Sequence, residues 1–262
     1  MSGTTVNPTA EQSTTGFFGK LPGRGDFIGR HLPKSFLGPW DDWLQAAIAH
    51  SRRQLGESWR EYYCTSPIWR FALGPGLCGP TTYAGILIPS MDRVGRYYPL
   101  VIAAALTPSW PLFALPTSAV EWFDQAEQLA LAALERDELD LDHFDRQVAA
   151  LGVPSTSDFP ASHSAHGDAW YWPLPQPLEL TGISPLLASE LLQQAFPLPS
   201  LWWTEGSDQI TRCLLICKGL PPIDGFAALL AGNWPQWGWS EKVSVDIASA
   251  WASRLPPKSE KP

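Results

Sequence analysis

Two short segments, residues 16–27 and 88–100, constrain the fold of this chain of 262 residues more than any other feature. Both combine Gly, Pro, Arg and Asp with bulky aromatic or aliphatic residues. A regular strand tolerates little Gly and Pro, and an ordinary surface loop does not need large aromatic side chains. Each segment is therefore typical of a specified turn that holds charged side chains at fixed positions.

The apolar pattern around these two segments predicts an α/β fold. Short connections between the expected strands favour antiparallel neighbours, and helical stripes separate the first strands from the last. This order predicts a single three-layer α-β-α sandwich with a mixed central sheet, and an α+β layout with helices on one face is the alternative. The expected strands are 17–21, 68–73, 83–88, 99–106, 201–204 and 210–217, and the expected helices are 38–48, 56–63, 118–134, 139–150, 185–196 and 221–230.

Two helix starts have specific end signals. Gly38 and Pro39 suit an N-cap and a first helical position. Ser118 and Glu121 have the spacing of a capping box. Residues 152–182 predict a long loop, in which His163, His166 and Asp168 are expected to be solvated rather than to bind a metal.

Residues 15–255 are expected to form one domain between two disordered tails, 1–14 and 256–262, whose composition is polar or rich in Pro. The N-terminus lacks the features of a signal peptide, and no apolar run reaches the length of a membrane span. These observations predict a cytoplasmic protein with no direct insertion into a membrane. The four cysteines form no CxxC pair, so we expect neither a disulfide nor a metal, and no cofactor.

The charge argues against nucleic-acid binding, because the chain carries a net charge of −8 and binding phosphates needs a basic patch. Residues 20–96 hold ten Lys and Arg against six Asp and Glu, whereas residues 97–262 hold eight against nineteen. Such a distribution suits an oriented protein partner, and two solvated faces explain it equally well. Five acidic residues, Asp137, Glu138, Asp140, Asp142 and Asp145, predict a solvated helical face that could also meet a basic partner.

The two motifs do not match a known catalytic pattern. Leu21 follows Lys20 where a P-loop requires Ser or Thr, and the chain has no Gly-x-Ser-x-Gly elbow. Gly23 and Gly25 are expected to adopt positive φ in a tight turn, with Asp26 capping nearby N–H groups. The charges of the second motif indicate either an ion-pair knot with Lys20 and Asp26 or a surface that grips an anion or a partner. We expect the two motifs to meet in space.

The motifs, together with residues 32–36, 40–44 and 67–73, resemble the TagF family of accessory proteins of bacterial type VI secretion systems. The similarity is dense over residues 16–106 and weaker beyond them. It implies a non-catalytic, cytoplasmic regulator that represses the secretion apparatus post-translationally and binds its forkhead-associated (FHA) scaffold protein.

The motif residues divide into two expected roles. Lys20, Arg24, Asp26 and Arg93 are the candidate partner-binding residues. An enzyme that uses Lys20, Asp26, Asp92 and Arg96, either a hydrolase or a small-anion-binding catalyst, is the alternative function, and a structural baseplate subunit is a third. The expected structural residues are Gly23, Gly25, Trp40, Asp41, Trp69, Arg70, Asp92, Gly95 and Arg96.

Overall fold

A computed structural model describes residues 15–106, 111–136, 138–154, 164–166, 169–171 and 184–239. The predicted tails, 1–14 and 256–262, lie outside the described residues, as do Asp137, His163 and Asp168. A small hairpin, β6 (Ser164–His166) with β7 (Ala169–Tyr171), lies within the expected loop.

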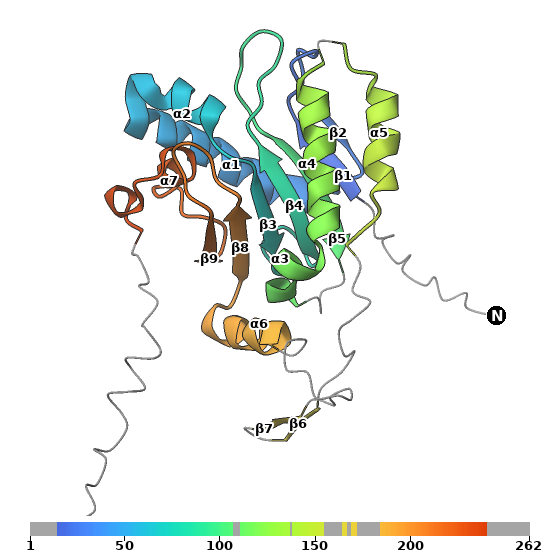
Figure 1. Ribbon diagram of the computed structural model, residues 1–262, viewed down its shortest axis with the longest axis vertical. Helices are drawn as coiled ribbons and strands as arrows, with labels where there is room; N and C mark the ends of the chain where they lie inside the picture. Colours follow the sequence, from blue (N-terminus) through green and yellow to red (C-terminus); the bar gives the residue numbers. More distant parts are fainter. Residues whose placement is uncertain are drawn as a thin grey trace, which may run out of the picture.

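Seven strands form one open sheet in the order β2-β1-β5-β4-β3-β8-β9 (Figure 1). Every pair of neighbours is antiparallel, so the expectation of a mixed sheet was wrong. The strands are β1 (Thr15–Gly19), β2 (Ile28–Arg30), β3 (Trp69–Leu73), β4 (Thr82–Ile88), β5 (Leu100–Leu106), β8 (Pro199–Thr204) and β9 (Cys213–Lys218).

Short loops explain the antiparallel arrangement. Four of the neighbouring pairs, β1–β2, β3–β4, β4–β5 and β8–β9, are joined directly, and a short loop can join only antiparallel strands. The other two pairs, β1–β5 and β3–β8, join strands that are distant in the sequence, and both are also antiparallel. A parallel pair needs a crossover that returns to the starting end of the sheet, and no such pair occurs in this seven-stranded sheet.

Helices cover both faces of the sheet, as the sandwich prediction required (Figure 1). One face packs against α3, α4, α5 and α6, and the other packs against α1, α2 and α7. The helices are α1 (Lys34–Leu55), α2 (Trp59–Thr65), α3 (Leu115–Ser118), α4 (Val120–Leu134), α5 (Leu141–Ala150), α6 (Ser184–Ala195) and α7 (Ala227–Ala231), with 3-10 turns η1 (Gly56–Ser58), η2 (Leu112–Ala114) and η3 (Trp234–Trp237).

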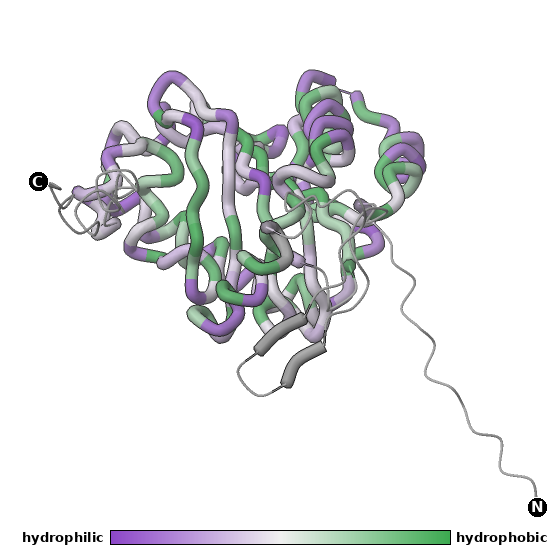
Figure 2. Tube along the Cα trace, turned by 60° about the horizontal axis from the view of Figure 1, so that its bottom comes forward, coloured by the Kyte–Doolittle hydropathy of each residue, from purple (hydrophilic) through white to green (hydrophobic). Residues whose placement is uncertain are grey.

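Alternating side chains build a separate core on each face of the sheet. In β5, Leu100 and Ile102 contribute to the α4 side, and Val101 contributes to the α1 side. Trp202 and Trp203 divide in the same way, and both are buried. Figure 2 shows the hydrophobic strands lying between helices whose outer turns are hydrophilic.

Some element ends differ from the sequence predictions. Helix α1 begins at Lys34 rather than at Gly38, so Pro39 lies inside it. The earlier turn brings Phe36 onto Trp40, with ring centroids 5.3 Å apart, and burial of that aromatic pair explains the early start. Helix α4 begins at Val120 without a side-chain cap, because Ser118 donates instead to the Ala114 carbonyl.

Strand β9 is one of the two edge strands of the sheet, opposite β2, and one of its faces is partly exposed. Leu214 and Ile216 are exposed there, while Leu215 and Cys217 point into the core with partly buried Cys213. Within the described residues, no helix is both long and apolar enough to cross a lipid bilayer.

Candidate functional site

The two sequence motifs meet in space, as predicted, at one end of the strands. The first motif forms the loop between β1 and β2, and the second forms the loop between β4 and β5. Because β1 pairs with β5, the two loops leave the sheet at the same end. The backbone N–H of Arg93 donates to the Arg24 carbonyl over 3.0 Å, and the Ser90 hydroxyl donates to the Lys20 carbonyl over 2.7 Å.

Asp92 is the centre of the contact between the loops. Its carboxylate accepts a hydrogen bond from the Lys20 ammonium and one from Arg96 Nε over 2.6 Å. Its other oxygen accepts from the backbone N–H groups of Val94 and Arg96 over 3.1 and 2.8 Å. Arg96 also donates to the Gly25 carbonyl and so reaches back to the first loop. We call Lys20, Asp92 and Arg96 the charge knot.

The charge knot keeps Asp92 ionised. Burial on its own would raise the pKa of the Asp92 carboxyl, but the hydrogen bonds from Lys20 and Arg96 hold that pKa well below its usual range. Lys20 and Asp92 are 5% and 3% exposed, so both charges lie within the protein rather than on its surface. The knot is therefore a structural link between two loops.

Burial separates the predicted partner-binding residues into two groups. Lys20 is enclosed by the knot, and its ammonium faces Asp92 rather than solvent. Arg24, Asp26 and Arg93 are exposed on the loops. Arg24 donates to the Leu139 carbonyl over 3.2 Å, whereas neither Asp26 nor Arg93 makes a side-chain hydrogen bond within the described residues. The expected capping by Asp26 was therefore wrong.

Exposed apolar side chains accompany these charges, and sequence analysis missed them. Phe27 is 47% exposed and Val94 65% exposed, and Met91 of the second loop is also exposed. Phe27 is held by Phe18 and Tyr98, whose ring centroids lie 5.4 and 4.7 Å from its own. The sequence signal that could have found these apolar side chains was their position within motifs rich in charged residues. We call Arg24, Phe27, Met91, Arg93 and Val94 the loop surface.

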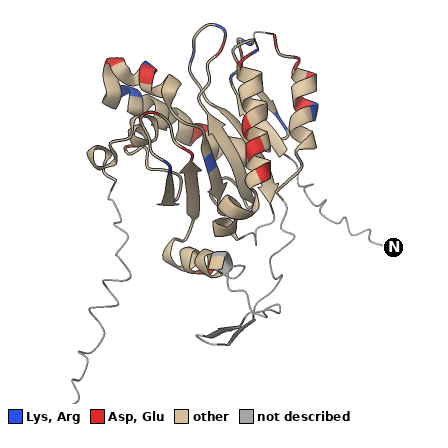
Figure 3. Ribbon diagram, viewed as in Figure 1, with Lys and Arg blue, Asp and Glu red and all other residues tan. Residues whose placement is uncertain are grey.

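A shallow cleft of about 390 Å³ lies where the two loops meet. Figure 3 shows both signs of charge at this edge of the molecule and acidic residues along α4. The cleft is lined by Gly23, Arg24, Gly25, Asp26, Ile28, Arg93 and Leu141.

The glycines of the motifs behave differently from one another. Gly95 has a φ of 82°, a conformation that favours glycine, and its N–H donates to the Asp92 carbonyl. Neither Gly23 nor Gly25 is among the described residues with positive φ, so that prediction was wrong. The first loop therefore turns without a left-handed residue at these two positions.

The remaining predicted structural residues hold the helices to the sheet. Arg70 is buried on β3 and donates to Glu127 and Asp124 of α4 over 2.6 and 2.7 Å. Trp40 of α1 is fully buried and lies against Phe71 and Trp202.

Two further hydrogen bonds serve the same purpose. The Trp69 indole donates to the Leu229 carbonyl of α7 over 3.0 Å. The Asp41 carboxylate accepts from the Tyr98 hydroxyl over 2.7 Å, which ties α1 to the end of the second motif.

The charge knot does not form a catalytic set. Its carboxylate already accepts four hydrogen bonds, so no oxygen remains free to act as a general base. Asp26 lies outside the knot, on the exposed part of the loop. Within the described ranges, no group of His, Cys, Asp and Glu could hold a metal ion, and the four cysteines are free thiols.

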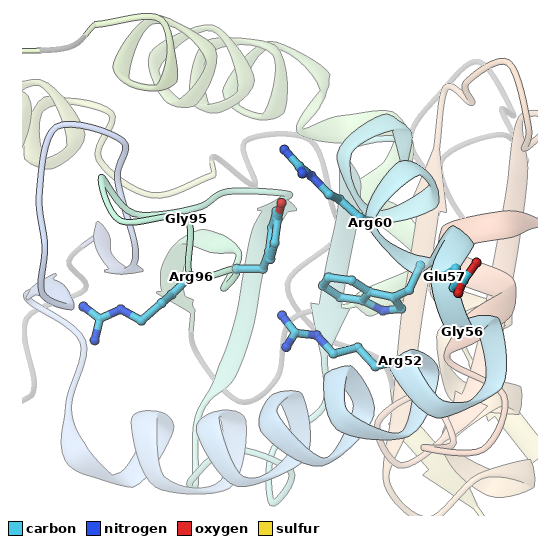
Figure 4. Close-up of a pocket in the computed structure, with 8 residues that line it drawn as sticks. Arg52, Gly56, Glu57, Arg60, Gly95 and Arg96 are labelled. Carbon is cyan, nitrogen blue, oxygen red and sulfur yellow. The ribbon is translucent and has the colours of Figure 1, made fainter.

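A second cleft lies on the other side of the β4–β5 loop. It measures about 490 Å³ and is lined by arginines from α1, α2 and the loop, together with two aromatic residues, two glycines and Glu57 (Figure 4). Sequence analysis missed it because its residues come from two segments, 52–60 and 95–97, that are distant in the sequence. The density of Arg and aromatic residues over 52–60 was the available signal. We call Arg52, Trp59, Arg60 and Tyr97 the arginine cleft.

The fold and the loops define an α/β protein with a seven-stranded antiparallel sheet and two charge-linked loops at one end of its strands. Comparison with known proteins identifies the class further. The family model described as TagF N-terminal domain, type VI secretion system-associated, matches residues 16–151. The chain therefore belongs to the TagF family of bacterial type VI secretion-associated proteins, a family generally regarded as non-catalytic.

A solved structure supports this assignment. The fold is similar to that of PA0076 from Pseudomonas aeruginosa PAO1, known from a crystal structure, with a TM-score of 0.73 and 36% sequence identity. The similarity covers 84% of this chain and 95% of the PA0076 chain. A search of curated proteins found no match.

Proposed function

We propose that this protein is a cytoplasmic regulator of type VI secretion that represses the apparatus post-translationally by binding its FHA scaffold protein. Membership of the TagF family gives the secretion system as the context. One observation supports a particular binding surface. The charge knot supports a group of exposed arginines and apolar side chains, the loop surface, at one end of the strands.

The composition of the loop surface favours a protein partner. Protein interfaces are enriched in aromatic residues, Met and Arg, and depleted in Lys and Glu. Phe27 and Val94 expose apolar area, and a partner that buries this area lowers the free energy of the complex. Arg24 and Arg93 stand beside this area and can each form paired hydrogen bonds with a carboxylate.

The rigidity of the loops also favours binding. Each loop is held by backbone hydrogen bonds and by the buried Lys20–Asp92 pair. A surface that is already ordered loses less conformational entropy when it binds, so more of the contact energy appears as affinity. On this proposal, the exposed arginines contact the scaffold, and the buried charges preserve the shape of the surface.

The test measures binding of the purified FHA scaffold by calorimetry. Arg24→Ala and Arg93→Ala should each weaken binding about tenfold or more, because a buried interface arginine can contribute more than about 1.4 kcal/mol. Arg212→Ala is the matched control, since Arg212 is exposed, pairs with Glu205 and does not line the cleft between the two loops. Equal melting temperatures would show that all variants are folded.

The same variants can be tested for function in cells. In a bacterium that lacks its own copy, the wild-type protein and Arg212→Ala should restore repression of secretion, and Arg93→Ala should not. Unchanged scaffold affinity in folded Arg24→Ala and Arg93→Ala would refute the loop surface. Failure of the wild-type protein to bind the scaffold would refute the proposed partner.

A further inference from the structure

The arginine cleft has an ordered aromatic floor. Trp59 is 4% exposed, and its indole N–H donates to the Ser51 hydroxyl over 2.9 Å. The Tyr97 ring meets the Trp59 ring edge-on at 5.4 Å, and Tyr63 stacks on Trp59 at 4.7 Å. These contacts fix the positions of both rings before any ligand binds.

The floor also orients one of the arginines. The Arg52 guanidinium lies 4.2 Å from the centroid of the Trp59 ring and 5.7 Å from that of Tyr97. Guanidinium groups stack on aromatic faces and still keep their N–H groups available at the edge. The stacked group is therefore held in place with its donors directed away from the rings.

Arg52 and Arg60 have no charged partner among the residues that the structure describes. Within the described residues, the side chains of Arg52 and Arg60 make no hydrogen bond and no ion pair. By contrast, Arg96, which also borders the cleft, is bound to Asp92. Figure 4 shows Arg52 and Arg60 reaching toward the loop of Gly95, while Arg96 and the carboxylate of Glu57 point away from them.

We propose that the arginine cleft binds an acidic segment of a protein partner, through carboxylates that bridge Arg52 and Arg60. A carboxylate matches the planar donor pair of a guanidinium, and an open cleft suits a chain that passes across it. The protein as a whole carries a charge of −8, which repels acidic peptides, so attraction must come from these local cations. This inference does not rest on the FHA scaffold being the partner.

A short fluorescein-labelled polyglutamate peptide tests the proposal by fluorescence anisotropy. The wild-type protein should bind this peptide and should not bind a polyglutamine peptide of equal length. Arg52→Gln and Arg60→Gln should each weaken binding about tenfold, since each loses one charge-assisted contact. The matched control is Arg53→Gln, because Arg53 is exposed next to Arg52 and contacts His50 instead.

Folding is checked separately, because Arg52 packs on Trp59 and its loss could disturb the helix. Arg60 makes no such ring contact in the described part of the chain, so Arg60→Gln decides the result if Arg52→Gln proves unstable. Arg52→Lys keeps the charge but not the planar donor pair, and it should weaken binding as well.

Several results would overturn the proposal. These are no binding of the polyglutamate peptide by the wild-type protein, an equal loss in Arg53→Gln, or tighter binding of inorganic phosphate than of the peptide. Arg24→Ala and Arg93→Ala should leave peptide binding unchanged, since neither residue lines the arginine cleft. Failure of this inference can therefore be distinguished from failure of the proposed scaffold contact.

Discussion

Replacing Asp92 with Asn removes the negative charge on which both motif loops converge. The Asn oxygen can still accept from the backbone N–H groups of Val94 and Arg96, so the loss falls on the charged partners. Lys20 then remains buried without a counter-ion. Removing one partner of a buried ion pair costs about 3–5 kcal/mol of folding free energy. For a protein of this size, that loss lowers the melting temperature by roughly 6–20 °C.

The effect should depend on pH in a defined direction. Burial would raise the pKa of Asp92, but hydrogen bonds from Lys20 and Arg96 lower it far below the unfolded value of about 3.9. The stabilisation is therefore present above about pH 4 and is lost as the pH falls further toward the folded pKa. The stability difference between wild type and Asp92→Asn should be constant down to that pH and should shrink below it.

Urea unfolding followed by tryptophan fluorescence measures these free energies. Asp26→Asn is the matched control, because it removes an exposed carboxylate from the same pair of loops and should change stability by less than about 0.5 kcal/mol. Adding Lys20→Met to Asp92→Asn should recover part of the loss, since the unpaired cation is then gone. An Asp92→Asn variant within about 1 kcal/mol of wild type would show that the charge knot does not hold the loops together.

Three further predictions concern the framework. Arg70→Ala should cost about 2–4 kcal/mol in urea unfolding, because it breaks two ion pairs between β3 and α4; a cost near zero would contradict this role. Gly85→Ala should destabilise the protein by about 1–3 kcal/mol, since its Cβ would lie 2.5 Å from the Ile102 carbonyl oxygen. Gly38→Ala should instead stabilise α1 by about 0.5–1 kcal/mol, because nothing beyond the neighbouring helix backbone lies within 4 Å of the added Cβ. A melting temperature equal to that of the wild type would refute the prediction for either variant. Iodoacetamide at neutral pH should label exposed Cys64 first, because burial raises the pKa of the Cys217 thiol to about 12; mass spectrometry of native protein labelled first at Cys217 would contradict this.

Local patterns in the sequence were sufficient for most of the sheet. The strands at 69–73, 82–88 and 100–106 were predicted to within one residue at each end, because apolar and β-branched runs bounded by Gly and Pro are local signals. The three-residue strand β2 was missed, since its residues, Ile28–Arg30, are too few to show alternation. The direction of the pairings is not local, and the expected mixed sheet proved to be antiparallel throughout.

The candidate site likewise has features that the sequence predicts and features that only the folded structure reveals. The sequence by itself determined that two motifs rich in charge and glycine would be turns, and it favoured ion pairing of Asp92 and Arg96, because the motifs carry opposite charges close together. Only the tertiary structure decided which charged side chains are buried in ion pairs and which stay exposed. Pairing of β1 with β5 brings Lys20 onto Asp92 and buries it, while Arg24 and Arg93 stay exposed.

The arginine cleft needed the tertiary structure to be recognised. Arg52, Trp59 and Arg60 lie close together in the sequence, but Tyr97 lies on a distant loop between two strands. No spacing in the sequence connects Tyr97 to the other three, since their approach depends on how α1 and α2 pack against the sheet. Residue type and local order thus determined which chemical groups the protein has. The packing of distant segments determined which of those groups remain free to bind, because exposure and pairing are properties of the folded surface.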